Sequence, residues 1–392
     1  MNKNLWLLTL CQGLFLTNNV TFMAINGLVG LSMAPLGWMA TLPVMGYVVG
    51  GALSTGLVAR TQQRFGRKNS FQLGLLVALG SALVCAWAAY SSQFWLLVAA
   101  TLVAGYYNAN AQLYRFAAAE LAAPAFKEKA VSLVMAGGLL GAVAGPNLAA
   151  ATRSMTTVPF AGAYLALAGV ALLAMLLLSV IDFPPAPPKG PTGAGGRPLS
   201  VIMRQPVFIV AASAGALGYG VMNLLMAATP IAMQVCGLPF SDTALVLEWH
   251  VIGMFAPGFF TGHLIKKFGT LPIMAVGLAL NAACVLIALS GVQLHQFLAA
   301  LFLLGVGWNF LFTGSTTLAM KAWTPAEKDR GQAAINFFVF STMAVTSFAS
   351  GALVTTQGWT WLNIGSLLPV ALTGVALVWM AIKQKSGQAA SA

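Results

Sequence analysis

Charged residues are scarce in this chain of 392 residues. Asp, Glu, Lys and Arg together make up 7% of it, whereas 59% of the residues are hydrophobic. A soluble domain of this size needs a polar surface to present to water, and this composition excludes one. The sequence therefore predicts an all-α polytopic membrane protein, because a helix satisfies its own backbone hydrogen bonds in lipid.

Cysteine is also rare. The four cysteines stand singly, as Cys11, Cys85, Cys236 and Cys284, with no C-x-x-C pair. This spacing excludes a disulfide framework and a zinc or iron-sulfur motif. The sequence contains no nucleotide-binding loop and no soluble sensory domain, so neither ATP-driven pumping nor an enzyme is indicated. We expect no cofactor.

Apolar runs long enough to cross a membrane occur twelve times. They lie at about 5–29, 36–59, 71–91, 93–119, 130–152 and 160–181, and again at about 207–233, 241–265, 271–291, 294–320, 331–355 and 360–382. The stretch PPAPPKGPTGAGGRP between the two sets forbids a continuous helix and predicts a flexible linker. We expect a six-helix bundle at 1–181, a cytoplasmic linker at 182–206, and a second six-helix bundle with a cytoplasmic tail at 207–392.

Basic residues gather in alternate connections between the predicted helices. They lie within 60–68, 127–129, 189–204, 266–267 and 321–330, and at Lys383 and Lys385 near the C-terminus. Cytoplasmic loops carry such an excess of Lys and Arg, so both termini are predicted to be cytoplasmic in a bacterial inner membrane. Topology thereby explains the net charge of +12 without a nucleic-acid partner.

Two pairs of side chains with soft donor atoms occur on consecutive predicted helices. Met222 and Met226 are four residues apart on the seventh span, as are His250 and Met254 on the eighth. Residues four apart share a helix face, and a turn near Gly237 would place the two pairs at similar depth. Thioether sulfur and neutral imidazole favour Cu(I) over Mg²⁺ or Ca²⁺. Packing is the alternative, because methionine commonly fills apolar helices.

Other side chains within the spans are candidates for a transport pathway. They are Asn18, Asn19, Tyr107, Asn108, Trp308 and Asn309, together with Met233, which extends the sulfur-bearing face of the seventh span to its outer end. Hydrogen bonds between helices are the alternative explanation for the polar members. Aromatic rings beside amides would also suit a flat organic solute such as a flavin.

Glu248 is the one acidic residue well inside a predicted span, and an intramembrane carboxylate is a functional candidate by default. It lies two residues from His250 and therefore on nearly the opposite face of the helix. We do not expect it to bind a metal. A proton site used during transport and a simple hydrogen bond to a neighbouring helix are the two interpretations.

The connection after the second span resembles a motif of the major facilitator superfamily. It ends in R-F-G-R-K at 64–68, and G-H-L-I-K-K-F-G at 262–269 resembles its copy in the second half. Gln63 and Lys266 stand where the family carries an acidic residue. The glycines and proline of 137–146 resemble its fifth-helix motif. The resemblance implies twelve helices in two six-helix halves, with transport by alternating access.

A narrower resemblance rests on Met222-x-x-x-Met226 and on His250-x-x-x-Met254, which F-A-P-G-F-F-T-G follows. These motifs resemble those of CcoA-like transporters, which import copper for assembly of cbb-type cytochrome oxidase. The resemblance implies that Met222 and His250 bind copper as the transported substrate, assisted by Met226 and Met254. It also implies membrane lipid and copper chaperones as partners. A sister branch carries riboflavin, so riboflavin or another small organic solute is the alternative.

Reporter fusions at Asn69, Lys189 and Lys383 test the predicted topology. All three should report a cytoplasmic position, because the basic connections set the orientation. A periplasmic signal at any of them, in a stably inserted fusion, would contradict the twelve-helix arrangement.

Overall fold

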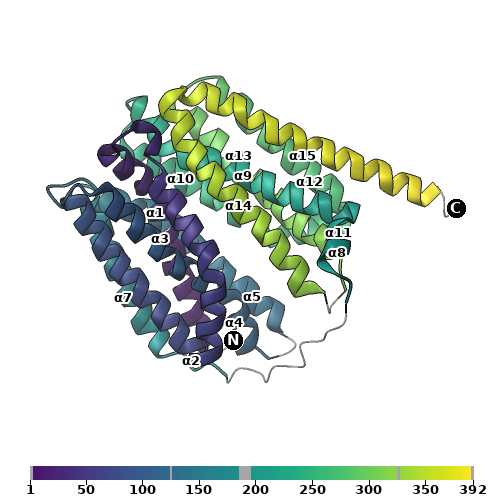
Figure 1. Cartoon of the computed structure of the whole chain (residues 1–392), viewed down its shortest axis with the longest axis horizontal. Coiled ribbons are helices and arrows are strands. Elements are labelled where there is room, and N and C mark those ends of the chain that lie inside the picture. The colour runs from purple at the N-terminus through teal and green to yellow at the C-terminus, as the bar shows by residue number, and fades with distance from the viewer. Residues whose placement is uncertain (1–2, 124–125, 185–195, 325–326, 390–392) are drawn as a thin grey trace.

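The computed structural model describes residues 3–123, 126–184, 196–324 and 327–389, which are almost entirely helical (Figure 1). The first half contains α1 (Lys3–Met33), η1 (Gly37–Met39), α2 (Leu42–Tyr90), α3 (Phe94–Ala111), α4 (Tyr114–Leu121), α5 (Lys127–Ala136), α6 (Gly138–Thr152) and α7 (Ala161–Ser179). The second half contains α8 (Leu199–Met203), α9 (Pro206–Val235), α10 (Phe240–Phe255), α11 (Gly258–Phe268), α12 (Thr270–Leu289), α13 (Leu294–Ala319), α14 (Lys328–Thr356) and α15 (Gly358–Ala389). The described residues contain no β-strand.

These helices form the twelve membrane spans that the sequence predicts, although some spans are merged and others broken. Within the described residues, nine helical segments are long and apolar enough to cross a membrane, one of them formed by α5 and α6 together, and α10 with α11, bent by 42°, makes a tenth. The 49 residues of α2 extend about 74 Å, so α2 crosses a hydrocarbon layer of about 30 Å twice. The pair α3 and α4 supplies the remaining span.

The boundaries of the helices differ from those of the predicted spans, because two predicted spans merge into α2 and others are broken. Gly66, with φ +77°, divides α2 into the second and third spans, and only glycine adopts this conformation without strain. The fourth span breaks between Ala111 and Tyr114, and the eighth bends at Pro257. Proline lacks a backbone N–H and clashes with the preceding turn, which explains the bend.

Glycine explains how closely α6 and the end of α5 pack against α1. A Cβ atom at Gly141 would lie 2.4 Å from Leu16 Cβ, and one at Gly137 would lie 2.3 Å from the Thr9 carbonyl oxygen. Both distances are far inside van der Waals contact, so a larger residue would push the helices apart. Small residues serve this purpose where membrane helices meet.

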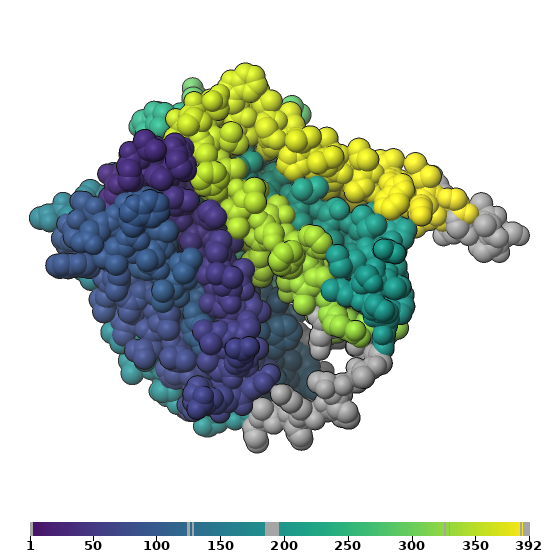
Figure 2. All heavy atoms as spheres, in the orientation of Figure 1, coloured from purple at the N-terminus to yellow at the C-terminus, as the bar shows by residue number. Residues whose placement is uncertain are grey.

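The end of α7 and the start of α8 mark the linker end of the molecule. The two halves touch at the opposite end. Phe160 of the first half packs 4.9 Å from Phe240 of the second, and the Arg153 guanidinium lies over both rings at 5.4 and 5.7 Å. Figure 1 shows the halves diverging toward the linker end. In the space-filling view the purple-to-blue first half meets the green-to-yellow second half along α14 (Figure 2). The molecule is therefore closed on one side.

A charged contact fastens the connection within α2 to the end of α4. Arg67 forms an ion pair with Glu120, and its Nη1 donates a hydrogen bond to Gln62 Oε1 at 2.9 Å. The family motif places an acidic residue where this chain has Gln63. The acidic partner of Arg67 in this connection is instead Glu120 of α4.

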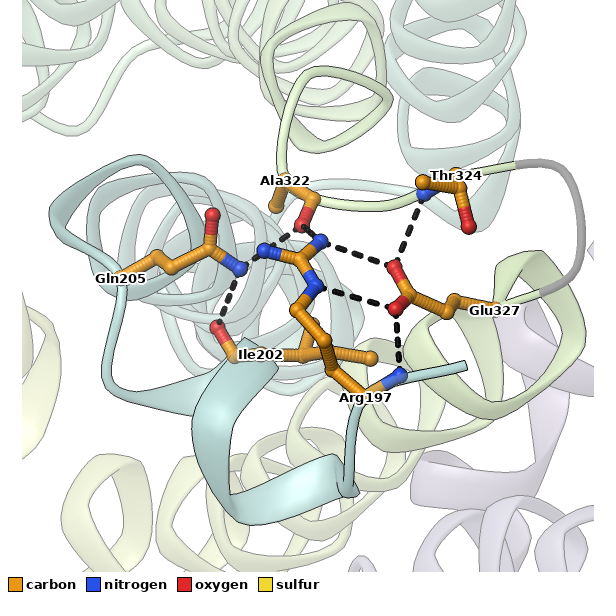
Figure 3. Close-up of polar contacts among 6 residues, drawn as sticks. All are labelled: Arg197, Ile202, Gln205, Ala322, Thr324 and Glu327. Atoms are coloured by element: carbon orange, nitrogen blue, oxygen red, sulfur yellow. Dashed lines mark hydrogen bonds and ion pairs between the residues drawn. The ribbon is translucent and has the colours of Figure 1, made fainter. Parts of the chain in front are cut away.

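A second ion pair joins Arg197, at the end of the linker, to Glu327 between α13 and α14 (Figure 3). Arg197 donates from Nε to Glu327 Oε1 at 2.9 Å, from Nη2 to Oε2 at 2.8 Å, and from its backbone N–H to Oε1 at 2.6 Å. The Thr324 N–H donates to Oε2 at 3.0 Å. These bonds favour the ionised form, so they hold the pKa of Glu327 well below its ordinary value, with Arg197 as the largest cause.

The linker is thus fixed at its described end. Gln205 Nε2 donates to the Ala322 carbonyl at 2.7 Å, as does Arg197 Nη2 at 3.0 Å. In this structure the last residues of the predicted 182–206 linker belong with the second half. The stretch 185–195, on which the prediction of flexibility depends, lies outside the described residues.

Arg197→Ala should lower the thermal stability by a few degrees, because it leaves the buried Glu327 carboxylate with backbone donors alone. Glu327 has a lowered pKa in the folded protein, so the pair stabilises the fold above the ordinary Glu pKa of about 4.3 and loses this effect below it. The difference in unfolding temperature between parent and variant should therefore be largest near neutral pH and should decrease below about pH 4. Thermal unfolding in detergent at several pH values measures the difference.

Arg204→Ala is the matched control for this prediction. It removes the same charge from the same segment, where no ion pair of Arg204 occurs among the described residues. A difference of equal size in both variants, or one independent of pH, would contradict the stabilising role of Arg197.

Candidate functional site

The candidate site is built from residues of both halves: three aromatic rings in mutual contact, Arg115, which interacts electrostatically with one of them, and two amides of the first half. We call it the central site, and it consists of Asn19, Asn108, Arg115, Tyr219, Trp308 and Phe312. Its members come from α1, α3 and α4 of the first half and from α9 and α13 of the second.

The second half contributes three aromatic rings. Trp308 and Phe312, one turn apart on α13, stack with their centroids 5.2 Å apart and their planes 8° apart. Tyr219 of α9 meets both edge-on, 5.2 Å from Trp308 and 5.4 Å from Phe312. Stacked and edge-on pairs are the favoured arrangements of aromatic rings. The buried Trp308 Nε1 has no hydrogen-bond partner among the described residues, so this donor is free for a ligand.

The first half contributes polar groups. Asn108 Oδ1 and Arg115 Nε are buried, and neither has a partner within the described part of the chain. Asn19 Nδ2 donates to the Tyr47 hydroxyl at 3.3 Å. A buried polar atom without a partner is unfavourable in a membrane protein unless a ligand or water satisfies it. Arg115 and Trp308 share Tyr219 as a neighbour, so their free donors are candidate contacts for one solute.

The polar and aromatic groups face each other across the two halves. Arg115 and Tyr219 lie close enough to interact electrostatically. Met23, one turn from Asn19 on α1, packs with Tyr219 around the apolar cluster that contains Val48. A solute bound here would contact both halves at once.

Sequence reasoning missed Arg115, Tyr219 and Phe312. Arg115 lies near the predicted cytoplasmic end of the fourth span, and the rule that selects Glu248, an ionisable residue inside a span, applies to it as well. It follows directly on the break between α3 and α4. The two aromatic residues carry no such signal, because aromatic residues are ordinary in membrane helices.

The predicted copper ligands are all buried in the second half. Met222 and Met226 on α9 are 3% and 8% exposed, and His250 and Met254 on α10 are 0% and 7% exposed. The turn between the two helices contains Gly237, with φ +76°. The three methionines share one apolar cluster, which also includes Met233. This burial is compatible with packing and with metal binding.

His250 keeps one ring nitrogen without a partner. Its Nδ1 lies 2.7 Å from the Leu301 carbonyl oxygen. That oxygen only accepts hydrogen bonds, so Nδ1 carries the proton. The lone pair on Nε2 is then available, and Nε2 is buried with no partner among the residues described. A histidine oriented in this way is ready to bind a metal or to accept a hydrogen bond.

Two residues of the predicted pathway lie inside the first half. Tyr107 is 3% exposed and packs edge-on against Phe15 at 5.6 Å, and Asn18 is also 3% exposed. The structure therefore places Tyr107 in the core of the first half, whereas Asn19 and Asn108 lie on α1 and α3 of the first half and Trp308 lies on α13 of the second.

Asn309 braces the bent eighth span. Its Nδ2 donates to the Met254 carbonyl at 2.7 Å, and its Oδ1 lies 2.7 Å from the Thr261 hydroxyl. These contacts bracket Pro257, where the helix loses its own hydrogen bonds. Both ends of this amide are occupied by protein.

Glu248 contacts the other half of the molecule. Its Oε2 accepts a hydrogen bond at 2.8 Å from Asn147 Nδ2 on α6. Glu248 thus forms a hydrogen bond to a neighbouring helix in this structure. The use of Glu248 as a proton site stays a prediction.

The model of the Major Facilitator Superfamily matches residues 5–257 and 222–391 of this chain. The chain belongs to the major facilitator superfamily. It is accordingly a polytopic membrane transporter, and its twelve helices in two halves are the fold of that superfamily.

Among its superfamily relatives, the riboflavin transporter RfnT of Brucella anthropi is 39% identical, with 99% of this chain and 98% of that protein covered. The solved structure of the POT family transporter PepTSo aligns with a TM-score of 0.74 at 11% identity over 99% of both chains. A bacterial homologue of the iron transporter ferroportin, in its inward-facing state, gives 0.71 at 14% identity over 96% and 98%. The two structures share the fold. RfnT offers no support for the expected likeness to copper importers.

Alanine substitutions of Asn108 and Asn309 should distinguish a free amide from a bracing one. Asn309→Ala removes the donor to the Met254 carbonyl, so the free energy of unfolding should fall by about 0.5–1.5 kcal/mol. Asn108→Ala removes an oxygen that has no protein partner, so the change should stay within about 0.5 kcal/mol. Thermal unfolding of both purified variants measures the difference, and equal losses would contradict it.

Proposed function

We propose that this transporter carries riboflavin, or a flat aromatic solute of the same class, across the bacterial inner membrane by alternating access. The observation that carries the proposal is the central site, where Tyr219 packs against the stacked rings of Trp308 and Phe312 and interacts with Arg115, whose Nε has no partner among the described residues. The 39% identity to a riboflavin transporter over nearly the whole chain supports the same substrate.

The chemistry of riboflavin matches the chemistry of these residues. Its isoalloxazine ring system is flat and offers a face for aromatic contact. One edge carries two carbonyl oxygens and an N–H group, and the ribityl chain carries hydroxyls. The Trp308 indole and the Arg115 guanidinium donate to carbonyl oxygens, whereas the Asn108 amide both donates and accepts. The apolar and polar contacts would come from different halves, so binding would couple to the movement of the halves.

The proposed orientation follows from the basic connections. With both termini in the cytoplasm, the contact of Phe160 with Phe240 closes the molecule toward the periplasm. The halves diverge toward the cytoplasm (Figure 1). Rocking of the halves about the bound solute would then open the other side.

Copper import is the second candidate, and one observation favours it. The buried Nε2 of His250 has no partner among the described residues, and Met222, Met226 and Met254 lie in the apolar core of the same half. Soft donors of this kind suit Cu(I), which would be the cargo rather than a resident cofactor. Under the riboflavin proposal these side chains pack α9, α10 and α13 together beside Trp308.

Riboflavin counterflow into proteoliposomes of the purified protein tests the main proposal. The parent should exchange external labelled riboflavin for internal riboflavin. Trp308→Ala removes the stacked ring, which is worth about 1.5 kcal/mol, so the affinity for riboflavin should fall about tenfold. Trp361→Ala is the control, because Trp361 is 61% exposed on α15 and belongs to no ring pair described above. Parent affinity in Trp308→Ala would contradict the site.

Copper content of cells expressing the parent or the double variant Met222→Ala/His250→Ala separates the two candidates. If the parent accumulates copper, the double variant does not, and riboflavin exchange is absent, copper import replaces the riboflavin proposal. The main proposal is supported if the parent exchanges riboflavin and if cells that express the parent and cells that express the double variant contain equal amounts of copper.

A further inference from the structure

Arg115 is a cation of the first half that interacts electrostatically with Tyr219 of the second half. It follows directly on the break that separates α3 from α4. Its guanidinium lies over the Phe116 ring at 4.9 Å from the centroid. A guanidinium presents its donors in a planar fork, and the buried Nε of this fork has no protein partner in the described residues.

No carboxylate in the described structure neutralises Arg115. The two ion pairs in the described residues join Arg67 to Glu120 and Arg197 to Glu327. The helices that carry the other members of the central site, α1, α3, α9 and α13, contain no acidic residue. Glu248 bonds to Asn147 at the seam between α6 and α10. The central site therefore has a net positive charge.

A cation without a counterion is costly where water is scarce, and the attraction between opposite charges is stronger there than in water. A solute that brings a negative charge would satisfy Arg115, whereas a neutral solute of the same shape offers only hydrogen-bond acceptors. Arginine pairs especially well with phosphate and carboxylate, because its fork makes two parallel hydrogen bonds. The aromatic rings would hold the flat part of either solute equally.

We propose that Arg115 determines specificity for charge, so that the central site prefers a flat aromatic solute bearing an anionic group over its neutral counterpart. Within the flavins, the preferred ligand is riboflavin carrying a phosphate monoester. This inference rests on the proposed function and deepens it, because it assigns the class of flavin that the site binds best.

Competition against labelled riboflavin in the counterflow assay tests the preference. In the parent, unlabelled riboflavin 5′-phosphate should inhibit exchange at a concentration at least tenfold lower than unlabelled riboflavin does. Arg115→Gln keeps hydrogen-bonding capacity without the charge. It should reduce the ratio of the two inhibitory concentrations, riboflavin to riboflavin 5′-phosphate, to about one. Arg115→Lys keeps the charge without the fork and should retain part of the preference. Arg153→Gln removes a positive charge at the closed outer end and should leave the ratio unchanged.

A parent that exchanges riboflavin but binds the phosphate ester no better would overturn this inference and leave the proposed function standing. A parent that exchanges no flavin would refute the proposed function. In that event, quenching of flavin fluorescence by the purified protein still decides the inference. Tighter binding of the phosphate ester that Arg115→Gln abolishes supports it, and equal or absent binding of the two flavins overturns it.

Discussion

Inside a bilayer a polar group has no water to bond, so it must find its partner within the protein. Several polar side chains in these spans bond to a backbone carbonyl of a neighbouring helix. Asn309 braces the bend at Pro257 by bonding the Met254 carbonyl, and Asn223 holds α9 to α14 through the Met343 carbonyl at 3.1 Å. Asn108, Arg115 and Trp308 are among the residues with a buried polar atom that has no partner in the described part of the chain.

The same constraint shapes the helices themselves. A span can break in the membrane only where other groups take over its lost hydrogen bonds. The eighth span bends where Asn309 reaches it, and the fourth breaks immediately before Tyr114 and Arg115. The interruption in the fourth span thus adjoins the charge that faces the second half. In the same half, Gly137 and Gly141 permit close packing of α1 on α6 and on the end of α5.

Copper and flavin were competing interpretations of neighbouring residues. The Met and His pairs are real features of α9 and α10, and His250 keeps a free nitrogen. Phe255, one residue beyond Met254, lies 6.5 Å from Trp308 of the central site. The spacing of the pairs could not show that an aromatic stack with free polar atoms lies beside them, because Tyr219, Trp308 and Arg115 come from three separate regions of the chain.

The sequence by itself determined the class of the protein, the number of its spans and its motifs. These depend on composition and on runs of neighbouring residues, so they need no knowledge of distant contacts. It also supplied Asn19, Asn108 and Trp308 as members of one candidate pathway. Only the tertiary structure separated Asn108 from Asn309, since both are amides inside a span and differ only in which helix lies opposite. It also decided that Arg197 holds Glu327, a contact between residues 130 positions apart. A hydrogen bond depends on distance and direction in space, and the order of residues along the chain specifies neither.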